Sequence, residues 1–266
     1  MRGSARRAKH NGMALFTDGP PSSIDELAAL DSQLLNVAST EGIDVTSKLE
    51  LAHEEAGLDL YALLKRTSPA DRLLWAVVKP NLENVAVTRG LKLWHAYRTL
   101  ELVYSDAYYS QLNDRYMAKC NRFQELAILH RERLIEAGLG MVSVPVPRAA
   151  APSLTAALGS LPDNTYYLTA TWVNRLSEEG ASAIPVTITT TASSFSAQMG
   201  AAPANASGWN VYVGTDPDGM ALQNGVPLGV GAAWVQPVWI STAGRKPGHG
   251  QAPDYVEALP RILQRG

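Results

Sequence analysis

Two short stretches begin like catalytic or cofactor-binding motifs, and neither is complete. His53-Glu54-Glu55 starts like the zinc-protease helix motif, which needs a second histidine four residues after the first, but position 57 is glycine. Gly138-Leu139-Gly140 imitates a nucleotide-binding loop, but Ser143 stands where the third glycine belongs and a helix precedes the loop instead of following it. We therefore expect no metal site, no cofactor and no enzymatic activity.

Three basic residues, Arg115, Lys119 and Arg122, recur at helical spacing and are expected to share one helix face. One interpretation is a solvated face whose charges pair with Asp114, Glu125 or a neighbouring helix. The other is a contact with a negatively charged partner surface, or with DNA that passes nearby. The sequence leaves both interpretations open.

The element expected to position these residues is a single very long helix over residues 88–137. Its apolar and aromatic side chains recur at steps of three and four residues, and no proline interrupts it. Thr88 can cap its first turn, and Gly138 can end it. An unbroken helix of this length would form a rod of roughly 70 Å, which needs long antiparallel neighbours or other subunits to cover its apolar stripe.

The long helix is expected to belong to a helical bundle over residues 22–148. A capping box at Ser23 opens a helix that runs to Gly42, and a second one at Ser47 opens another. A third start is Ser68-Pro69, where serine caps and proline takes the first helical position. The apolar positions of the helix that begins at Ser47 are Leu51, Ala52, Leu58 and Leu63.

The pattern changes to that of short strands after the bundle. Residues 166–173 alternate with period two, and residues 184–191, 194–199 and 209–213 are further strand candidates. Such strands without helices between them predict a small antiparallel β-sandwich over residues 149–240. This segment has five acidic residues after position 150 and only Arg175 as a base, so it is a poor candidate for binding phosphate. The fold class is thus α+β with two domains.

Both ends of the chain are expected to be extended. Residues 1–21 form a basic, flexible segment without the apolar run of a secretory signal. Residues 241–266 are rich in glycine and proline and form a C-terminal arm whose apolar groups have nothing local to cover them. An arm of this kind orders against a groove or a sheet edge on a partner. Its apolar residues are Tyr255, Val256, Leu259, Ile262 and Leu263.

The composition limits the class of protein further. No stretch approaches the roughly 18 apolar residues of a membrane-spanning helix, so no membrane partner is expected. The formal net charge is −2. Cys120 is the only cysteine, which excludes an internal disulfide and permits assembly in a reducing cytoplasm.

One part of the helical half resembles a known family. Leu91 to Tyr108, Asn113-Asp114-Arg115-Tyr116, Phe123 to Ala127 and Val144-Pro145-Val146-Pro147-Arg148 resemble the head–tail connector (adaptor) proteins of tailed bacteriophages. The likeness extends over residues 22–148, about half of the chain, and rests on packing motifs.

The resemblance implies a structural virion protein of the head–tail neck, assembled in the host cytoplasm. Its protomers would form a ring of about a dozen copies beneath the portal, with the C-terminal arm docking on the portal protein. Neighbouring copies, the portal and tail or neck proteins would be its partners, and DNA would pass through the ring without sequence-specific binding.

The sheet half has a different resemblance. Tyr166 to Ala183 resembles the last strands of a fibronectin type III module, and Gly208 to Gly214 an earlier strand, so that an Ig-like or fibronectin-like domain is implied. Two alternative functions stay open: a tail or baseplate adhesin whose sandwich binds glycan, and a tail-associated hydrolase.

Overall fold

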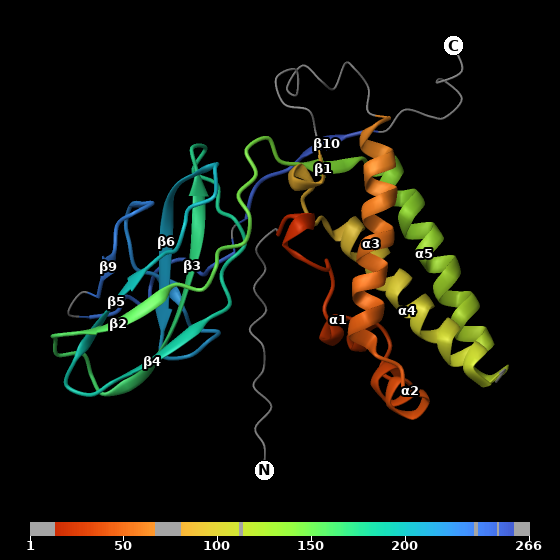
Figure 1. The fold of residues 1–266 in the computed structure, drawn as a ribbon, viewed down its shortest axis with the longest axis horizontal. Helices are drawn as coiled ribbons and strands as arrows, with labels where there is room; N and C mark the ends of the chain where they lie inside the picture. Colours follow the sequence, from red (N-terminus) through yellow and green to blue (C-terminus); the bar gives the residue numbers. More distant parts are fainter. Residues whose placement is uncertain (1–13, 67–80, 112–113, 237–238, 249, 258–266) are drawn as a thin grey trace. The chain divides into compact units, whose positions relative to one another are not determined.

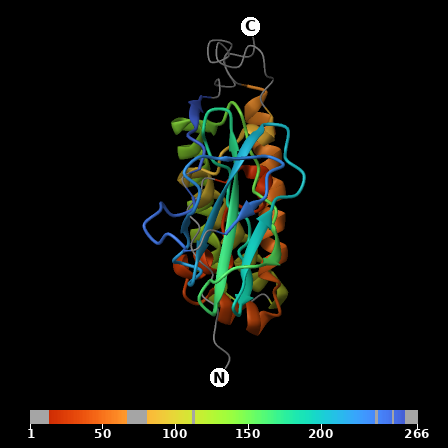
Figure 2. The same ribbon diagram turned by 90° about the vertical axis from the view of Figure 1, so that its left-hand side faces the viewer.

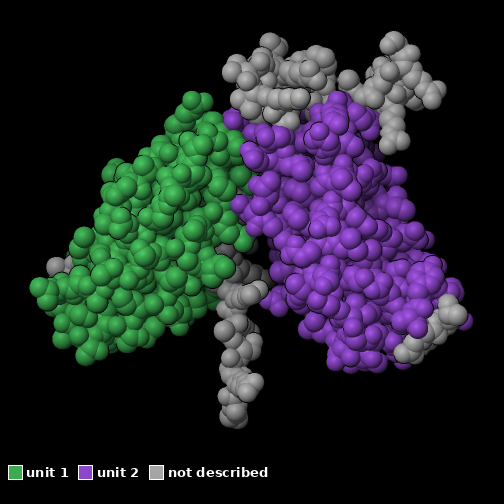
Figure 3. All heavy atoms as spheres, in the orientation of Figure 1, with its two compact units in different colours: residues 1–15, 144–252 green, residues 16–143, 253–266 purple. Residues whose placement is uncertain are grey.

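The computed structural model describes residues 14–66, 81–111, 114–236, 239–248 and 250–257. Within them, five α-helices of the N-terminal half precede the antiparallel sheets of the C-terminal half, so the predicted α+β class is confirmed (Figure 1). The chain divides into two compact units (Figure 3). We call residues 16–143 and 253–266 the helical unit, and residues 1–15 and 144–252 the sheet unit, each as far as it is described.

The helical unit begins with the predicted capping box. Ser23 Oγ accepts from the Glu26 N–H at 3.4 Å, and the Glu26 carboxylate accepts from the Ser23 N–H at 3.1 Å. The expected single helix up to Gly42 is wrong, because the Asp31 side chain accepts from the Gln33 N–H at 3.2 Å and breaks it. The two resulting helices are α1 (Ile24–Leu30) and α2 (Leu34–Glu41).

The third helix, α3 (Val45–Leu64), starts earlier than predicted. Asp44 caps it by accepting from the Thr46 N–H at 2.9 Å, and Ser47 Oγ donates to the same carboxylate. The helix expected from Ser68-Pro69 lies outside the described residues.

The prediction of one helix over residues 88–137 is wrong. The stretch forms α4 (Arg89–Gln111) and α5 (Met117–Ala137), with a 3-10 turn at Asp114–Tyr116 (η4) before α5. Asparagine and aspartate in this connection favour turns over helix. The two helices pack antiparallel, so that each covers the apolar stripe of the other: the Tyr97 ring stacks on the His130 ring at 4.9 Å. A hairpin thereby buries the stripe within one chain.

The buried face of α3 also differs from the prediction. Ala52 and Leu63 are buried as expected, but Leu51 is exposed and Leu58 is 75% exposed. The buried stripe of α3 therefore runs along a different face of the helix from the one through Leu51 and Leu58. It consists of Leu49, Ala52, Ala56, Leu60 and Leu63. None of the described helices has both the length and the apolarity that crossing a bilayer requires.

The sheet unit contains two antiparallel sheets. One has the order β4-β3-β6-β7, with β8 also paired to β6, and the other has the order β2-β5-β9. The long strands β3 and β6 lie side by side (Figure 2). Their register places Trp172 opposite Trp209. Both sheets contribute to one hydrophobic cluster that includes Trp209 and Phe195. The strands are β2 (Ser153–Ala157), β3 (Asn164–Asn174), β4 (Val186–Thr190), β5 (Ser194–Gln198), β6 (Ala206–Gly214), β7 (Ala221–Leu222), β8 (Leu228–Gly229) and β9 (Trp234–Val235).

The described part of the C-terminal segment is not a free arm. Strand β10 (Asp254–Val256) pairs with β1 (Leu139–Met141) inside the helical unit, and Val256 is only 7% exposed. Gly138, at a φ of +85°, lets the backbone of Val256 pass 3.1 Å from the position that a Cβ would take. Earlier residues of the segment belong to the sheet unit, where Arg245 binds Glu179.

Candidate interaction site

The residues of the predicted basic face lie at the start of the α5 region. Arg115 Nη2 is 2.6 Å from Glu41 Oε1, and Lys119 Nζ is 2.8 Å from Asp31 Oδ1. Both carboxylates come from the α1–α2 region, so these two cations bind acids of neighbouring elements. Arg122 is exposed at the surface of α5.

Asp31 is the centre of a buried polar cluster. It accepts from Lys119 and from the Tyr104 hydroxyl, and Lys119 Nζ lies 3.0 Å from the same hydroxyl. Although burial raises the pKa of the Asp31 carboxyl, the hydrogen bonds from Lys119 and Tyr104 hold it below its ordinary value. Burial and the bond to Asp31 raise the pKa of Tyr104. The cluster ties α1 to α4 and α5 and leaves Lys119 unavailable for another anion.

Of the predicted portal-docking residues the structure describes two, one in the core and one at the surface. Val256 packs into the helical unit, which contradicts the expectation that nothing local covers it. Tyr255, its neighbour on β10, is exposed. Leu259, Ile262 and Leu263 lie outside the described residues.

The incomplete zinc motif is divided between separate contacts. The His53 ring packs on the Phe16 ring at 4.2 Å, while Glu55 binds Arg98. Among the described residues, no group of three or more His, Cys, Asp or Glu side chains is placed to hold a metal ion.

A buried serine and histidine lie within hydrogen-bonding distance in the helical unit. Ser22 Oγ is 2.6 Å from His95 Nδ1, and His95 Nε2 is 3.2 Å from the Leu49 carbonyl oxygen. A carbonyl only accepts, so Nε2 carries the proton and Nδ1 accepts from the serine hydroxyl. Burial lowers the pKa of His95 to about 4. The ring has no exposed surface, so we assign this pair to packing rather than to catalysis.

The sheet unit holds a buried carboxylate that is fully surrounded by donors. Glu179 accepts from Arg245 at 2.6 Å, from the Tyr212 hydroxyl at 2.7 Å and from the Asn210 amide. Burial raises the pKa of Tyr212, and the charge of Glu179 raises it further. Since Arg245 follows the last strand of the two sheets, this cluster fixes residues near 245 to β6.

The helical unit has an open groove of about 450 Å³ between α3, α4 and α5. Its floor is Trp94, which is 5% exposed, and its rim carries Leu58 from α3 and Ile128 from α5. Leu58 is 75% and Ile128 53% exposed. Apolar side chains of this size at an open rim mark a surface suited to a protein partner. We call this feature the α3–α5 groove.

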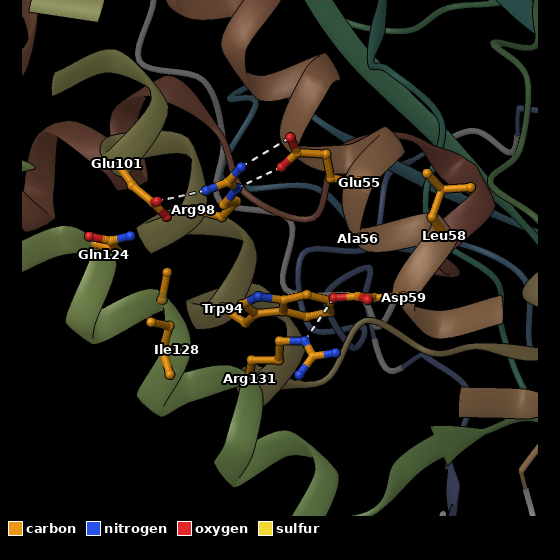
Figure 4. A pocket seen from close by; sticks show the side chains of 11 residues that line it. Glu55, Ala56, Leu58, Asp59, Trp94, Arg98, Glu101, Gln124, Ile128 and Arg131 are labelled. Carbon is orange, nitrogen blue, oxygen red and sulfur yellow. Dashed lines mark hydrogen bonds and ion pairs between the residues drawn. The ribbon is translucent and has the colours of Figure 1, made fainter. Parts of the chain in front are cut away.

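Ion pairs hold both ends of the α3–α5 groove (Figure 4). At one end Arg98 binds Glu55 through two hydrogen bonds of 2.6 and 3.0 Å, and Glu101 at 2.7 Å. At the other end Arg131 Nε lies 2.7 Å from Asp59 Oδ2. The hydrogen bonds that Arg98 donates to Glu55 and Glu101 raise its pKa, so it is charged at every physiological pH. These pairs join the three helices and leave one carboxylate more than cations in the lining.

The α3–α5 groove was not predicted, because the spacing of Leu51 and Leu58 is that of core residues. The available signal was the presence of two apolar stripes on α3. One stripe contains Leu49 and Leu60 and is buried, and the other contains Leu51 and Leu58 and is exposed. A helix with a second apolar stripe is expected to contact more than one neighbour.

Comparisons of the chain with protein-family models, with curated proteins and with solved structures find no match.

Proposed function

We propose that this protein is a structural virion component that forms the connector ring between the portal and the tail of a tailed phage. The observation that carries the proposal is the α3–α5 groove, an open apolar surface on a helical unit. The stretch from Leu91 to Tyr108, which resembles connector proteins, lies in α4, and three of its residues, Trp94, Arg98 and Glu101, line this groove. The resemblance and the groove thus point to the same part of the molecule.

The sheet unit has a separate role in this proposal. We infer that its two sheets form an Ig-like or fibronectin-like sandwich, because both contribute to one hydrophobic cluster. With five acids against Arg175 over residues 151–240, it does not suit DNA. It would decorate the neck or bind other neck or tail proteins. DNA would pass through the ring without sequence-specific binding.

The portal contact is assigned to the end of the chain. Strand β10 anchors the segment on β1, so Val256 is a fixed point rather than a docking group. Tyr255 remains exposed next to this anchor. Tyr255, Leu259, Ile262 and Leu263 are therefore the residues that we propose for docking on the portal.

The test is coexpression of the tagged protein with the portal protein of the same phage genome. We expect copurification and, by electron microscopy, a ring of about a dozen copies on the portal. Leu58→Asp should prevent ring formation, whereas Leu158→Asp, at a fully exposed apolar site of the sheet unit, should not. Failure to capture the portal, together with binding or cleavage of cell-wall glycan, would replace the connector by the adhesin or the hydrolase.

A further inference from the structure

The two flanks of α5 differ in character. Side chains of Gln124, Ile128 and Arg131 line the α3–α5 groove. Lys119, Arg122 and Leu126 line a different hollow, which α5 forms with the end of α1 and with α4. The same helix therefore presents two separate surfaces, one on each side.

The second flank carries a stripe of four residues. Arg122, Leu126, Leu129 and Arg133 are spaced i, i+4, i+7 and i+11, which places them in line along the helix. Leu129 is 38% exposed, and the two arginines are exposed at the ends of the stripe. At 1.5 Å per residue the arginine Cα atoms are roughly 16 Å apart. We call this the Arg122–Arg133 stripe.

We propose that the Arg122–Arg133 stripe of one copy occupies the α3–α5 groove of a second copy. Both surfaces have an apolar centre between charged ends. The groove has Leu58 and Ile128 between the carboxylates of Glu55 and Glu101 at one end and Asp59 at the other. The occupant is a second copy of this chain because the arginines of the stripe complement the surplus carboxylate of the groove.

The charges within the groove are not all neutralised by its own ion pairs. Glu55 and Glu101 share the single cation Arg98 at one end, so an incoming arginine meets a net negative charge there. By helical spacing, Glu125 and Glu132 of α5 fall on the outer side of the helix, between the groove and the stripe. They therefore lie at the edge of the proposed contact, where exposed charges contribute little.

This contact joins two different surfaces, so it is heterologous. Each copy offers a groove to one neighbour and a stripe to the other, and such contacts form rings when the rotation closes. The contact itself stands without the connector role, but its closure into a ring rests on the proposed function.

Cysteine trapping on the full chain tests the contact. Leu58→Cys and Leu129→Cys are placed in separate proteins, each with Cys120→Ala, and the mixture is oxidised by air with copper phenanthroline. We expect a 58–129 disulfide heterodimer to form at least tenfold faster than in a mixture of Leu58→Cys with Ile184→Cys. Ile184 lies on the sheet unit and serves as the control: at 73% exposed it is more accessible than Leu129 at 38%, so accessibility alone would favour the control.

The size of the disulfide-linked products also shows whether each copy contacts one neighbour or two. A single protein with both cysteines should give a ladder of oligomers, since every copy links to two neighbours, whereas the mixture of single variants should stop at dimers. The proposal would be overturned if Leu58→Cys formed disulfides with Leu129→Cys and with Ile184→Cys at equal rates. It would also be overturned if Leu58→Cys formed a homodimer faster than the 58–129 heterodimer.

Charge reversal gives a second measurement that does not depend on cysteine reactivity. Arg122→Glu with Arg133→Glu should slow 58–129 trapping by about tenfold or more, while Arg175→Glu on the sheet unit should leave it unchanged. An unchanged rate in the double variant would overturn the proposal. Portal capture is measured separately, so a chain that captures portals without 58–129 trapping refutes the contact alone, and trapping without capture refutes the connector role alone.

Discussion

Acidification between pH 7 and pH 5 is expected to destabilise the helical unit through His95. The ring is fully buried, and burial holds its pKa at about 4, against 6.5 for an exposed histidine. Between these values the unfolded chain binds a proton that the folded chain does not. Stability is therefore fully present above pH 6.5 and is lost as the pH falls toward 4.

The size of the effect follows from the two pKa values. The full difference of about 2.5 units corresponds to about 3 kcal/mol below pH 4, and about 2 kcal/mol of it is lost by pH 5. Burial also lowers the pKa of His53, which adds a loss of the same sign. Carboxylates with lowered pKa values, such as Asp31, reduce the free energy of unfolding only at lower pH. The range from pH 7 to pH 5 therefore reports on the histidines.

The assay is urea denaturation followed by circular dichroism at 222 nm, which reports on the helices. We expect the free energy of unfolding to fall by about 2 kcal/mol between pH 7 and pH 5. His95→Gln should remove most of this slope, because glutamine can still donate to the Leu49 carbonyl but does not titrate. His130→Gln, at a less buried histidine of α5 whose pKa is lowered by burial and by Arg133, should retain most of it. A slope that survives His95→Gln would refute the reasoning.

Three further predictions concern glycine packing, the buried carboxylate and the chain end. Gly140→Ala places a Cβ 2.5 Å from Thr88 Cγ2 and should lower the free energy of unfolding, measured by urea denaturation, by about 1–3 kcal/mol. Gly57→Ala, whose Cβ would be in ordinary contact inside α3, should raise it by about 0.5–1 kcal/mol. Equal effects of the two substitutions would contradict this. Glu179→Gln should weaken the hold on Arg245 and speed proteolysis near that residue at least several-fold, and an unchanged rate would contradict it. Truncation after Glu257 should leave a folded protein that no longer captures portals. Truncation after Gly250 also removes β10 and should lower the melting temperature of the helical unit. Normal portal capture by the protein truncated after Glu257 would refute the docking assignment.

The features predicted correctly from the sequence are those that depend on neighbouring residues alone, such as a helix cap or a single strand. The capping box at Ser23 forms as expected, and the strand candidates at residues 166–173 and 209–213 lie within β3 and β6. These signals depend on hydrogen bonds within one turn or on the alternation of a single strand. By contrast, strands β7, β8 and β9 have two residues each and are too short to show a period.

The predictions that proved wrong concern segments whose sequence pattern fits two structures, where only tertiary contacts determine which one forms. The apolar stripe of residues 88–137 fits a long helix and a hairpin equally well, because periodicity does not say which neighbour covers it. Tyr97 and Tyr104 meet His130 and Phe123 only after the chain reverses. The pairing of β1 with β10 joins segments more than 100 residues apart, and no local signal marks it.

The same limit explains why the candidate site was found in the structure and not in the sequence. Leu58 has the spacing of a core residue relative to Leu51, and only the packing of α4 shows that another stripe of α3 is buried instead. The exposed stripe then needs a cover that the described helical unit does not supply. Burying Leu58 and Ile128 against a neighbour stabilises an assembly by roughly 1.5–3 kcal/mol for each fully covered side chain, before the cost of association. Two such residues alone give weak association, so the arginines and the repetition of the contact around a ring must contribute the rest.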